Sequence, residues 1–444
     1  MTGRSSGARR FGPGTRTYAR SRRGSVAKLS GATLAPTVLA ALTGPIVARV
    51  LGPAGRGQVA AVVVYAAALP VVLSFGVPLA IGQRAVWEPD RRPALVSAAL
   101  VLAALTIPFT VAGTWLIMVG PLHTIGGWAR FWAVLNLLFT PASEVGLSFQ
   151  ALLQAEGALG PLAKVRAIPL VVSALTTLGF FALHRLTVAT DLAGNLAAGA
   201  AAALATVIYV RDRPRGRYPL RPLLGFGARG FGWNVANMAN ARLDQILMAP
   251  YLASAQIGIY AVAVALATVP IQISGAVTAR SFGEVGASSQ RGREAARYMR
   301  LTALVLVGCC LAVAAPAPWL IPLVFGHAYR ATFTPLLLLL PGSLALGLSA
   351  TAASTLVILN KPQWPTWAEV AGLVVTVAGL AVFLRPFGIV AASAVSSVAY
   401  GATLAWNVRF LRRLGVVDLA PRWADCRWLR NRVLQVVRPS HARA

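Results

Sequence analysis

Charged residues are scarce in this sequence, and acidic residues are the scarcest of them. Only 12% of its 444 residues are charged, and 12 Asp and Glu stand against 41 Lys and Arg. A soluble domain usually carries about 25% charged residues, so the composition excludes large soluble domains. The 57% of hydrophobic residues instead suffices for about a dozen membrane-spanning helices of about 20 residues each.

Cysteine and histidine are rare as well, which excludes several kinds of site. Cys309 and Cys310 are adjacent in one apolar run and Cys426 stands in a basic stretch, so neither a disulfide framework nor a CxxC metal motif is present. The four histidines are too far apart for metal-ligand spacing. Walker and GxSxG motifs are also missing, which argues against ATP hydrolysis and serine acyl transfer. We therefore expect no metal site, no cofactor and no enzymatic activity.

The positive charge of the chain fits membrane topology better than nucleic-acid binding. A formal net charge of +29 would suggest nucleic acid in a soluble protein, but here the basic residues fall between apolar runs and in both tails. The positive-inside rule and anionic lipid account for that distribution. Because most basic residues fall in the tails and in alternate loops, we expect both termini on the cytoplasmic side of a bacterial inner membrane, and no nucleic-acid partner.

Apolar runs bounded by charged or turn-forming residues predict about twelve transmembrane helices. The expected spans are 29–50, 59–81, 94–119, 131–153, 167–183, 192–210, 231–253, 257–281, 301–324, 333–359, 367–384 and 388–410. The predicted organisation is a basic disordered cytoplasmic arm (1–28), an N-terminal six-helix bundle (29–210), a basic cytoplasmic linker (211–230), a C-terminal six-helix bundle (231–410) and a basic cytoplasmic tail (411–444).

A short repeat supports the division into halves. The stretch LGPAGRGQVAAVVVY begins at Leu51 and LASAQIGIYAVAVAL begins at Leu252, so that Gly57 and Gly258 follow their leucines at the same six-residue offset. Two six-helix halves related by a pseudo-twofold axis along the membrane normal, with a substrate site between them, are a common transporter plan. The predicted fold is therefore an all-α polytopic membrane protein with two six-helix bundles around a central cavity.

The seventh expected span carries a stripe of polar residues. Asn234, Asn237 and Asp244 recur at helical steps, and Arg242 flanks them. An ionisable side chain facing lipid costs about 2.5 to 3.5 kcal/mol on insertion scales, so these residues should face inward. We interpret Asn234, Asn237 and Arg242 as substrate-binding and Asp244 as ion-coupling. An inward ion pair or a ladder of Asn side chains that joins helices is the alternative.

The fourth expected span has a second stripe, formed by Asn136, Thr140, Glu144 and Ser148 at four-residue intervals. Its carboxylate, Glu144, could load and release a proton or a sodium ion, and it is our second ion-coupling candidate. Pairing with an arginine such as Arg242 explains a carboxylate in the membrane equally well.

Arginines stand at both expected mouths of the cavity. Arg49 ends the first span on the outer side, whereas Arg84 and Arg280 end the second and eighth spans on the inner side. Arginine offers paired donors to phosphate oxygens, so these three residues could bind an anionic substrate such as a diphosphate. The alternative for each is that its side chain reaches the lipid headgroups.

Two stretches of the sequence resemble a known family. GPIVARVLGPAGRGQVAAVVVYAAALPVVLSFGV is similar to the first-to-second-span region, and ARLDQILMAPYLASAQIGIYAVAVAL to the seventh-to-eighth-span region, of bacterial lipid-linked oligosaccharide and polysaccharide flippases. These belong to the multidrug/oligosaccharidyl-lipid/polysaccharide exporter superfamily. The resemblance implies alternating access that moves an undecaprenyl-diphosphate-linked sugar to the outer leaflet, driven by a cation gradient. On the matching positions, Arg49 corresponds to the family's Arg before LG and Asp244 to its Asp in the seventh span.

The expected function is therefore translocation of a lipid-linked glycan across the cytoplasmic membrane, with membrane lipids and H+ or Na+ as further partners. One alternative is a multidrug or cation antiporter of the same superfamily, which would prefer a cavity richer in carboxylates and aromatic residues. A membrane glycosyltransferase or polymerase is less favoured, because every expected outer loop is short. The basic tails could bind anionic lipid or glycan-assembly proteins.

Overall fold

The computed structural model describes residues 15–287, 290–359, 361 and 363–416. Within this part, the side chains of residues 15–42 and of some later residues, among them Asn234, Asn237 and Arg280, lie outside the description. Residues 1–14 of the expected basic arm and 417–444 of the expected basic tail lie outside the described residues. Residues 15–28 of the arm, which the sequence predicts to be disordered, are instead the first part of α1.

The described residues form helices joined by turns. The first half of the chain contains α1 (Thr15–Leu73), α2 (Val77–Trp87), η1 (Pro89–Arg91), α3 (Arg92–Leu105), α4 (Ile107–Val119), α5 (Gly127–Leu138), α6 (Thr140–Ala155), α7 (Leu159–Ala182) and α8 (Val188–Tyr209). The second half contains α9 (Leu220–Met248), α10 (Ser254–Ala287), α11 (Arg291–Ala314), α12 (Ala317–Phe325), η2 (His327–Thr332), α13 (Phe333–Ile358) and α14 (Gln363–Arg413).

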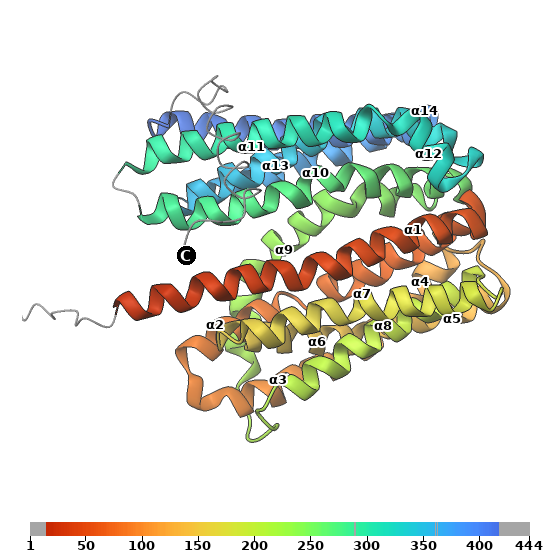
Figure 1. Cartoon of the computed structure of the whole chain (residues 1–444). Helices are drawn as coiled ribbons and strands as arrows, with labels where there is room; N and C mark the ends of the chain where they lie inside the picture. Colours follow the sequence, from red (N-terminus) through yellow and green to blue (C-terminus); the bar gives the residue numbers. More distant parts are fainter. Residues whose placement is uncertain (1–14, 288–289, 360, 362, 417–444) are drawn as a thin grey trace, which may run out of the picture.

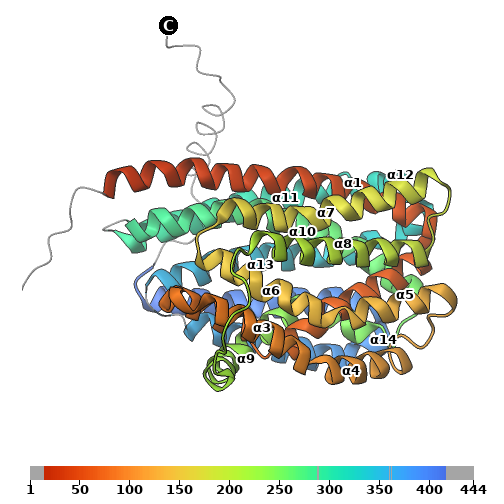
Figure 2. The same cartoon turned by 90° about the horizontal axis from the view of Figure 1, so that it is seen from below.

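The helices form two bundles, and α9 passes between them (Figure 1). Helices α1 to α8 make up the first bundle. Helices α10 to α14 make up the second, together with the end of α9 around Asp244, which contacts α10 and α14, and α1 packs against α10 across the boundary. Figure 2 shows that the long helices of both bundles run side by side in nearly the same direction. The expected all-α architecture of two helical bundles is thus confirmed.

The number of twelve spans is not confirmed. Among the described residues, seven helices are long and apolar enough to cross a membrane, or eight if the bent pair α3 and α4 counts as one span. Some expected spans consist of shorter pieces, since α5 gives way to α6 at Phe139 and α11 is followed by the short α12 after Pro316. By contrast, α14 holds two expected spans in one element, separated by a kink at Gly388.

Two kinks depend on glycine. Gly52 within α1 has φ 65° and ψ 178°, and Gly388 within α14 has φ 55° and ψ −133°. Side chains other than hydrogen are disfavoured at these positive φ angles. Because the whole turn in α1 is made at Gly52, the helix resumes at once, and Arg56 lies inside a helix rather than in the loop that the sequence predicts there.

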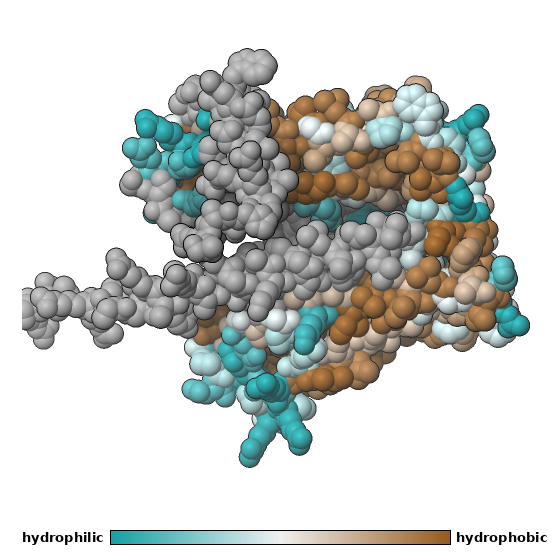
Figure 3. Space-filling view, viewed as in Figure 1, coloured by the Kyte–Doolittle hydropathy of each residue, from teal (hydrophilic) through white to brown (hydrophobic). Residues whose placement is uncertain are grey.

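Large apolar side chains are exposed on the surface of both bundles. Phe109, Trp115 and Trp319 are 64%, 64% and 74% exposed, and Figure 3 shows hydrophobic residues along the helices with hydrophilic residues toward their two ends. Exposed apolar surface of this extent is the surface of a membrane protein rather than of a soluble one. The chain is therefore a multi-pass membrane protein.

The two ends of the molecule differ in charge. The end of α2 and the start of α3, the linker before α9 and the start of α11 lie at the same end (Figure 1), and their sequences are rich in arginine. We call this end the basic end and the opposite one the outer end. This arrangement agrees with the alternation of basic loops that the sequence predicts.

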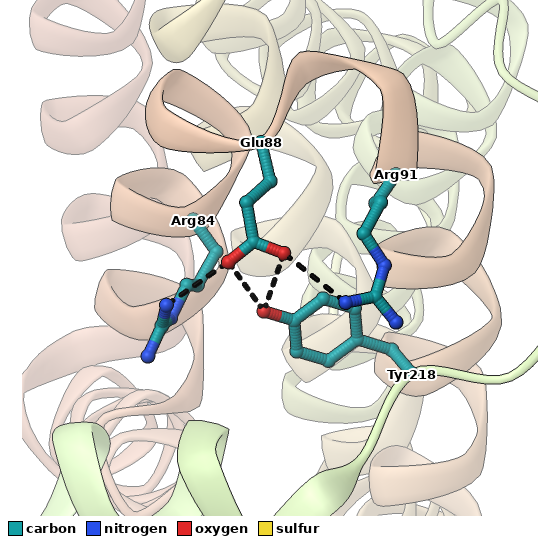
Figure 4. Close-up of polar contacts among 4 residues, drawn as sticks. All are labelled: Arg84, Glu88, Arg91 and Tyr218. Carbon is teal, nitrogen blue, oxygen red and sulfur yellow. Dashed lines mark hydrogen bonds and ion pairs between the residues drawn. The ribbon is translucent and has the colours of Figure 1, made fainter.

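A polar cluster at the basic end holds the linker against the first bundle (Figure 4). Glu88, which follows α2, pairs with Arg84 at 2.9 Å and with Arg91 at 3.4 Å. The Tyr218 hydroxyl of the linker donates to both Glu88 carboxylate oxygens, at 3.0 and 3.2 Å. The Arg91 guanidinium also lies 4.7 Å from the centre of the Tyr218 ring. One carboxylate therefore joins the linker to the turn after α2.

We expect acid to release this attachment. Partial desolvation raises the pKa of Glu88, but the Tyr218 hydroxyl, Arg84 and Arg91 together hold that pKa below its ordinary value. The ionised carboxylate therefore stabilises the attachment above the unfolded-state pKa of about 4.3, and this contribution is lost as the pH falls through the folded-state value. Hydrogen-exchange protection of the linker amides should drop below about pH 4 while protection within α13 is retained, and Tyr218→Phe should lower it already at pH 7. Equal protection in Tyr218→Phe would contradict this role.

Candidate functional site

A cavity of about 500 Å³ lies between the two bundles. Helices α1, α7 and α8 line it from one side, and α9, α10, α13 and α14 line it from the other. Two of its lining residues mark its depth: Asp191 stands in the first turn of α8, and Asp244 stands four residues before the end of α9 at Met248. The cavity therefore lies toward the outer end. Its volume falls within the range of about 300 to 1,000 Å³ that is usual for small-molecule sites.

The second bundle contributes a buried carboxylate and an arginine. The Asp244 side chain accepts hydrogen bonds from the Tyr260 hydroxyl, from the Ser396 hydroxyl at 3.3 Å and from the Gln245 backbone N–H at 2.7 Å. Three donors satisfy a carboxylate that would otherwise be costly to bury. Arg242, two residues earlier on α9, is exposed and lines the same cavity.

The first bundle contributes a matching pair. Arg56 on α1 and Asp191 on α8 both line the cavity. Asp191 is buried, where it interacts with the Thr177 hydroxyl and with the charge of Arg56. The Nε atom of Arg56 is buried and has no hydrogen-bond partner. A buried donor without a partner carries a desolvation cost, so the protein alone leaves this guanidinium incompletely hydrogen-bonded.

The outer end is closed by direct contact between the two backbones. A Cβ atom built on Gly57 would overlap the carbonyl oxygen of Ser254 and lie 2.9 Å from the Gly258 nitrogen. A Cβ atom built on Gly258 would overlap the carbonyl oxygen of Pro53. Helices α1 and α10 can approach this closely only because both positions are glycine. The two glycines at matching places in the sequence repeat thus meet each other between the bundles.

Hydrogen bonds from side chains reinforce this closure. Arg49 on α1 donates to the carbonyl oxygens of Leu323 and, at 2.8 Å, of Val324 at the end of α12. The Tyr329 hydroxyl donates to the Ala48 carbonyl oxygen at 3.2 Å. Cationic groups suit the carbonyl end of a helix. Arg49 therefore links the first bundle to the second in this conformation.

The structure brings together only part of the predicted site. Arg242 and Asp244 line the cavity, whereas Arg49, Arg84 and Glu144 do not. Arg84 is paired with Glu88 at the basic end. The remaining predicted side chains, those of Asn234, Asn237 and Arg280, lie outside the described residues.

Two residues that line the cavity were missed by the sequence analysis. The sequence places both residues in outer loops. A Gly/Pro-rich stretch precedes Arg56, and Asp191 stands just before the start of an apolar run. Both residues lie within one helical turn of a predicted span, and a charged residue at such a position can belong to the helix rather than to the loop. Among the described residues, no group of three or more His, Cys, Asp or Glu could hold a metal ion.

The chain matches one known protein family by sequence. The model of a family described as polysaccharide biosynthesis protein matches residues 46–334. No curated protein matches the chain by sequence.

Several solved structures share the fold. A structure of the lipid II flippase MurJ in an inward closed conformation superimposes with a TM-score of 0.70 at 11% identity, covering 86% of this chain and 87% of the other. An inward-facing multidrug resistance MATE family transporter of the MOP superfamily gives 0.67 at 14% identity, with coverage of 85% and 95%. A structure of the MATE multidrug transporter DinF-BH gives 0.58 at 13% identity, with coverage of 87% and 95%. These neighbours are transporters and flippases rather than enzymes, which agrees with the sequence analysis.

Proposed function

Because this chain belongs to the polysaccharide biosynthesis protein family, we propose that it is a flippase that moves a polyprenyl-diphosphate-linked oligosaccharide to the outer leaflet of the bacterial cytoplasmic membrane. The polar headgroup would occupy the cavity between the bundles while the polyprenyl chain stays in lipid. Translocation would follow alternating access, with the basic end facing the cytoplasm. The fold shared with a lipid II flippase supports this proposal.

The single observation that carries the proposal is the charge arrangement of the cavity. Each bundle supplies one arginine and one aspartate, and the Nε of Arg56 has no partner in the protein. Guanidinium groups offer directed donors to phosphate oxygens. Because the two arginines come from opposite bundles, a diphosphate held by both would couple headgroup binding to the relative position of the bundles.

We propose a cation gradient as the driving force, with Asp244 as its site in the second bundle. Its carboxylate contacts α10 through Tyr260 and α14 through Ser396. A proton or Na+ that neutralises Asp244 would weaken these hydrogen bonds. Ion binding would thereby change the packing of three helices that line the cavity.

The test is leaflet-resolved translocation in proteoliposomes. A fluorescent polyprenyl-diphosphate sugar in the inner leaflet should become accessible to an external enzyme or quencher only when the protein is present. Asp244→Asn and Arg242→Ala should each reduce the initial rate at least tenfold, because one removes the charge of the coupling site and the other a cavity cation. Arg130→Ala is the matched control, because Arg130 is an exposed arginine on α5 that does not line the cavity. Equal rates with and without protein would overturn the proposal.

The fold shared with MATE transporters favours a second candidate, a multidrug or cation antiporter. The same proteoliposomes distinguish the two when they are loaded with a lipophilic cationic dye. A flippase should leave dye efflux at the level of empty vesicles. Efflux driven by a pH or Na+ gradient, with no effect on the lipid-linked sugar, would favour the antiporter.

A further inference from the structure

A second buried carboxylate lies inside the first bundle, apart from the central cavity. Glu144 on α6 is 5% exposed and does not line the cavity. Its Oε2 atom lies 2.9 Å from the Thr106 hydroxyl, and its Oε1 atom is buried without a hydrogen-bond partner. A buried carboxylate with one unsatisfied oxygen needs a ligand, because its charge and its free lone pairs are both costly in an apolar bundle.

No described cation compensates this charge. Glu144 forms none of the ion pairs in the described part of the chain. The described charged side chains on the helices packed around α6 lie near helix ends, at the contact between the bundles or at the cavity: Arg49, Arg56, Arg84, Arg92, Arg130, Lys164, Arg166 and Asp191. The pairing with Arg242 that the sequence left open is absent too, because Arg242 lies at the central cavity.

The Thr106 hydroxyl contacts Glu144, and two further threonines lie one helical turn away along the same helices. Thr106 and Thr110 stand one turn apart at the start of α4, and Thr140 stands one turn before Glu144 on α6. Since α4 and α6 run antiparallel, the contact between Thr106 and Glu144 places Thr110 in register with Thr140. The Thr110 hydroxyl is buried and has no partner either. The layer thus holds two unsatisfied groups, a carboxylate oxygen and a hydroxyl.

The helices on both sides of this layer are interrupted. The α3–α4 pair bends by 41° at Thr106, and the α5–α6 pair is broken at Phe139, with Pro108 and Pro141 in the first turns that follow. Proline-interrupted helices within a membrane mark binding sites in transporters. Burial favours the neutral acid, whereas the start of α4 next to the carboxylate favours the anion.

We propose that Glu144 and Thr106 form a proton-binding site in the first bundle, separate from the central cavity. The proton resides on the Glu144 carboxyl. The geometry of Thr106 supports this, because its single hydroxyl hydrogen lies between two acceptors, the Ala103 carbonyl oxygen at 2.8 Å and Glu144 Oε2 at 2.9 Å. With the hydroxyl donating to Ala103, a protonated Glu144 donates to the Thr106 oxygen. The Oε1 atom keeps no partner, but it is less costly to bury in a neutral acid than in a carboxylate.

Infrared spectroscopy of the full chain in liposomes tests proton binding directly. At about pH 6, where exposed glutamates with a pKa of about 4.3 are ionised, the wild type should show the carbonyl stretch of a protonated carboxylic acid that Glu144→Gln lacks. Glu156→Gln is the matched control, because Glu156 lies at the end of the same helix and is paired with Arg92. This variant should leave the band unchanged. A spectrum of Glu144→Gln identical to the wild type in this region would overturn the proposal. Loss of the band on adding Na+ at constant pH would also overturn it, in favour of a sodium site.

A role of this site in coupling rests on the proposed flippase function, whereas proton binding does not. In the translocation assay, an imposed pH gradient should change the wild-type rate at least threefold and change the rate of Glu144→Gln by a clearly smaller factor. An equal response of both proteins would overturn the coupling role. Absence of translocation in the wild type would instead count against the proposed function, and the infrared result would stand independently.

Discussion

Replacing Gly57 by alanine should prevent closure of the outer end and reduce translocation at least tenfold. The added Cβ atom would overlap the Ser254 carbonyl oxygen, so α1 and α10 would have to separate. The change favours the helix itself, because alanine is about 0.8 to 1 kcal/mol better than glycine in a helix interior. Any loss of activity therefore reflects the contact between helices and not a weaker helix.

The separation can be measured from outside the membrane. Thr268 on α10 is exposed and lines the cavity, so a cysteine placed there, with the native cysteines replaced, reports access to the cavity. A membrane-impermeant thiol reagent added outside should label it at least tenfold faster in Gly57→Ala than in the parent. Gly258→Ala should behave in the same way, because its Cβ atom would overlap the Pro53 carbonyl oxygen.

Gly275 on the same helix provides the matched control for these variants. A Cβ atom there meets no other atom within 4 Å, so Gly275→Ala should keep the parental labelling and translocation rates. Parental behaviour of Gly57→Ala and Gly258→Ala in both assays would show that the glycine contact is not needed for closure.

The sequence predicts the architecture well because membrane burial leaves a strong local signal. Apolar runs of about 20 residues locate helices regardless of how those helices pack. The same signal cannot show where a helix breaks. The sequence therefore predicts continuous spans through Thr106 and Phe139, whereas one helix ends and another begins at each of these residues. The number of spans remains a prediction for that reason.

The site is less predictable because it depends on contacts between distant segments. The polar stripe on the seventh span located Asp244 and Arg242, which do line the cavity. The offset of Gly57 and Gly258 was visible as a repeat, but only the packing of α1 on α10 shows that the two glycines meet. Arg56 was placed in a loop since local sequence does not reveal that a single residue, Gly52, makes the whole turn.

Arg56 is the residue whose replacement should most strongly weaken headgroup binding. Its Nε is a buried donor without a hydrogen-bond partner in the protein, and a hydrogen bond to a charged group contributes about 1.5 to 3 kcal/mol. Removal of that interaction should raise the dissociation constant for a diphosphate ligand about tenfold to a hundredfold. Arg56→Gln tests this with farnesyl diphosphate as a short polyprenyl diphosphate probe, by calorimetry on the detergent-purified chain.

Two further variants separate charge from geometry at this position. Arg56→Lys keeps the charge but loses the planar guanidinium, so its affinity should fall between those of the wild type and Arg56→Gln. Asp191→Asn removes the carboxylate whose charge acts on Arg56, and it should leave binding unchanged or make it tighter, because the ligand no longer competes with that charge. Wild-type affinity in Arg56→Gln, with folding verified by size-exclusion chromatography, would remove Arg56 from the binding site and leave Arg242 as the arginine that holds the headgroup.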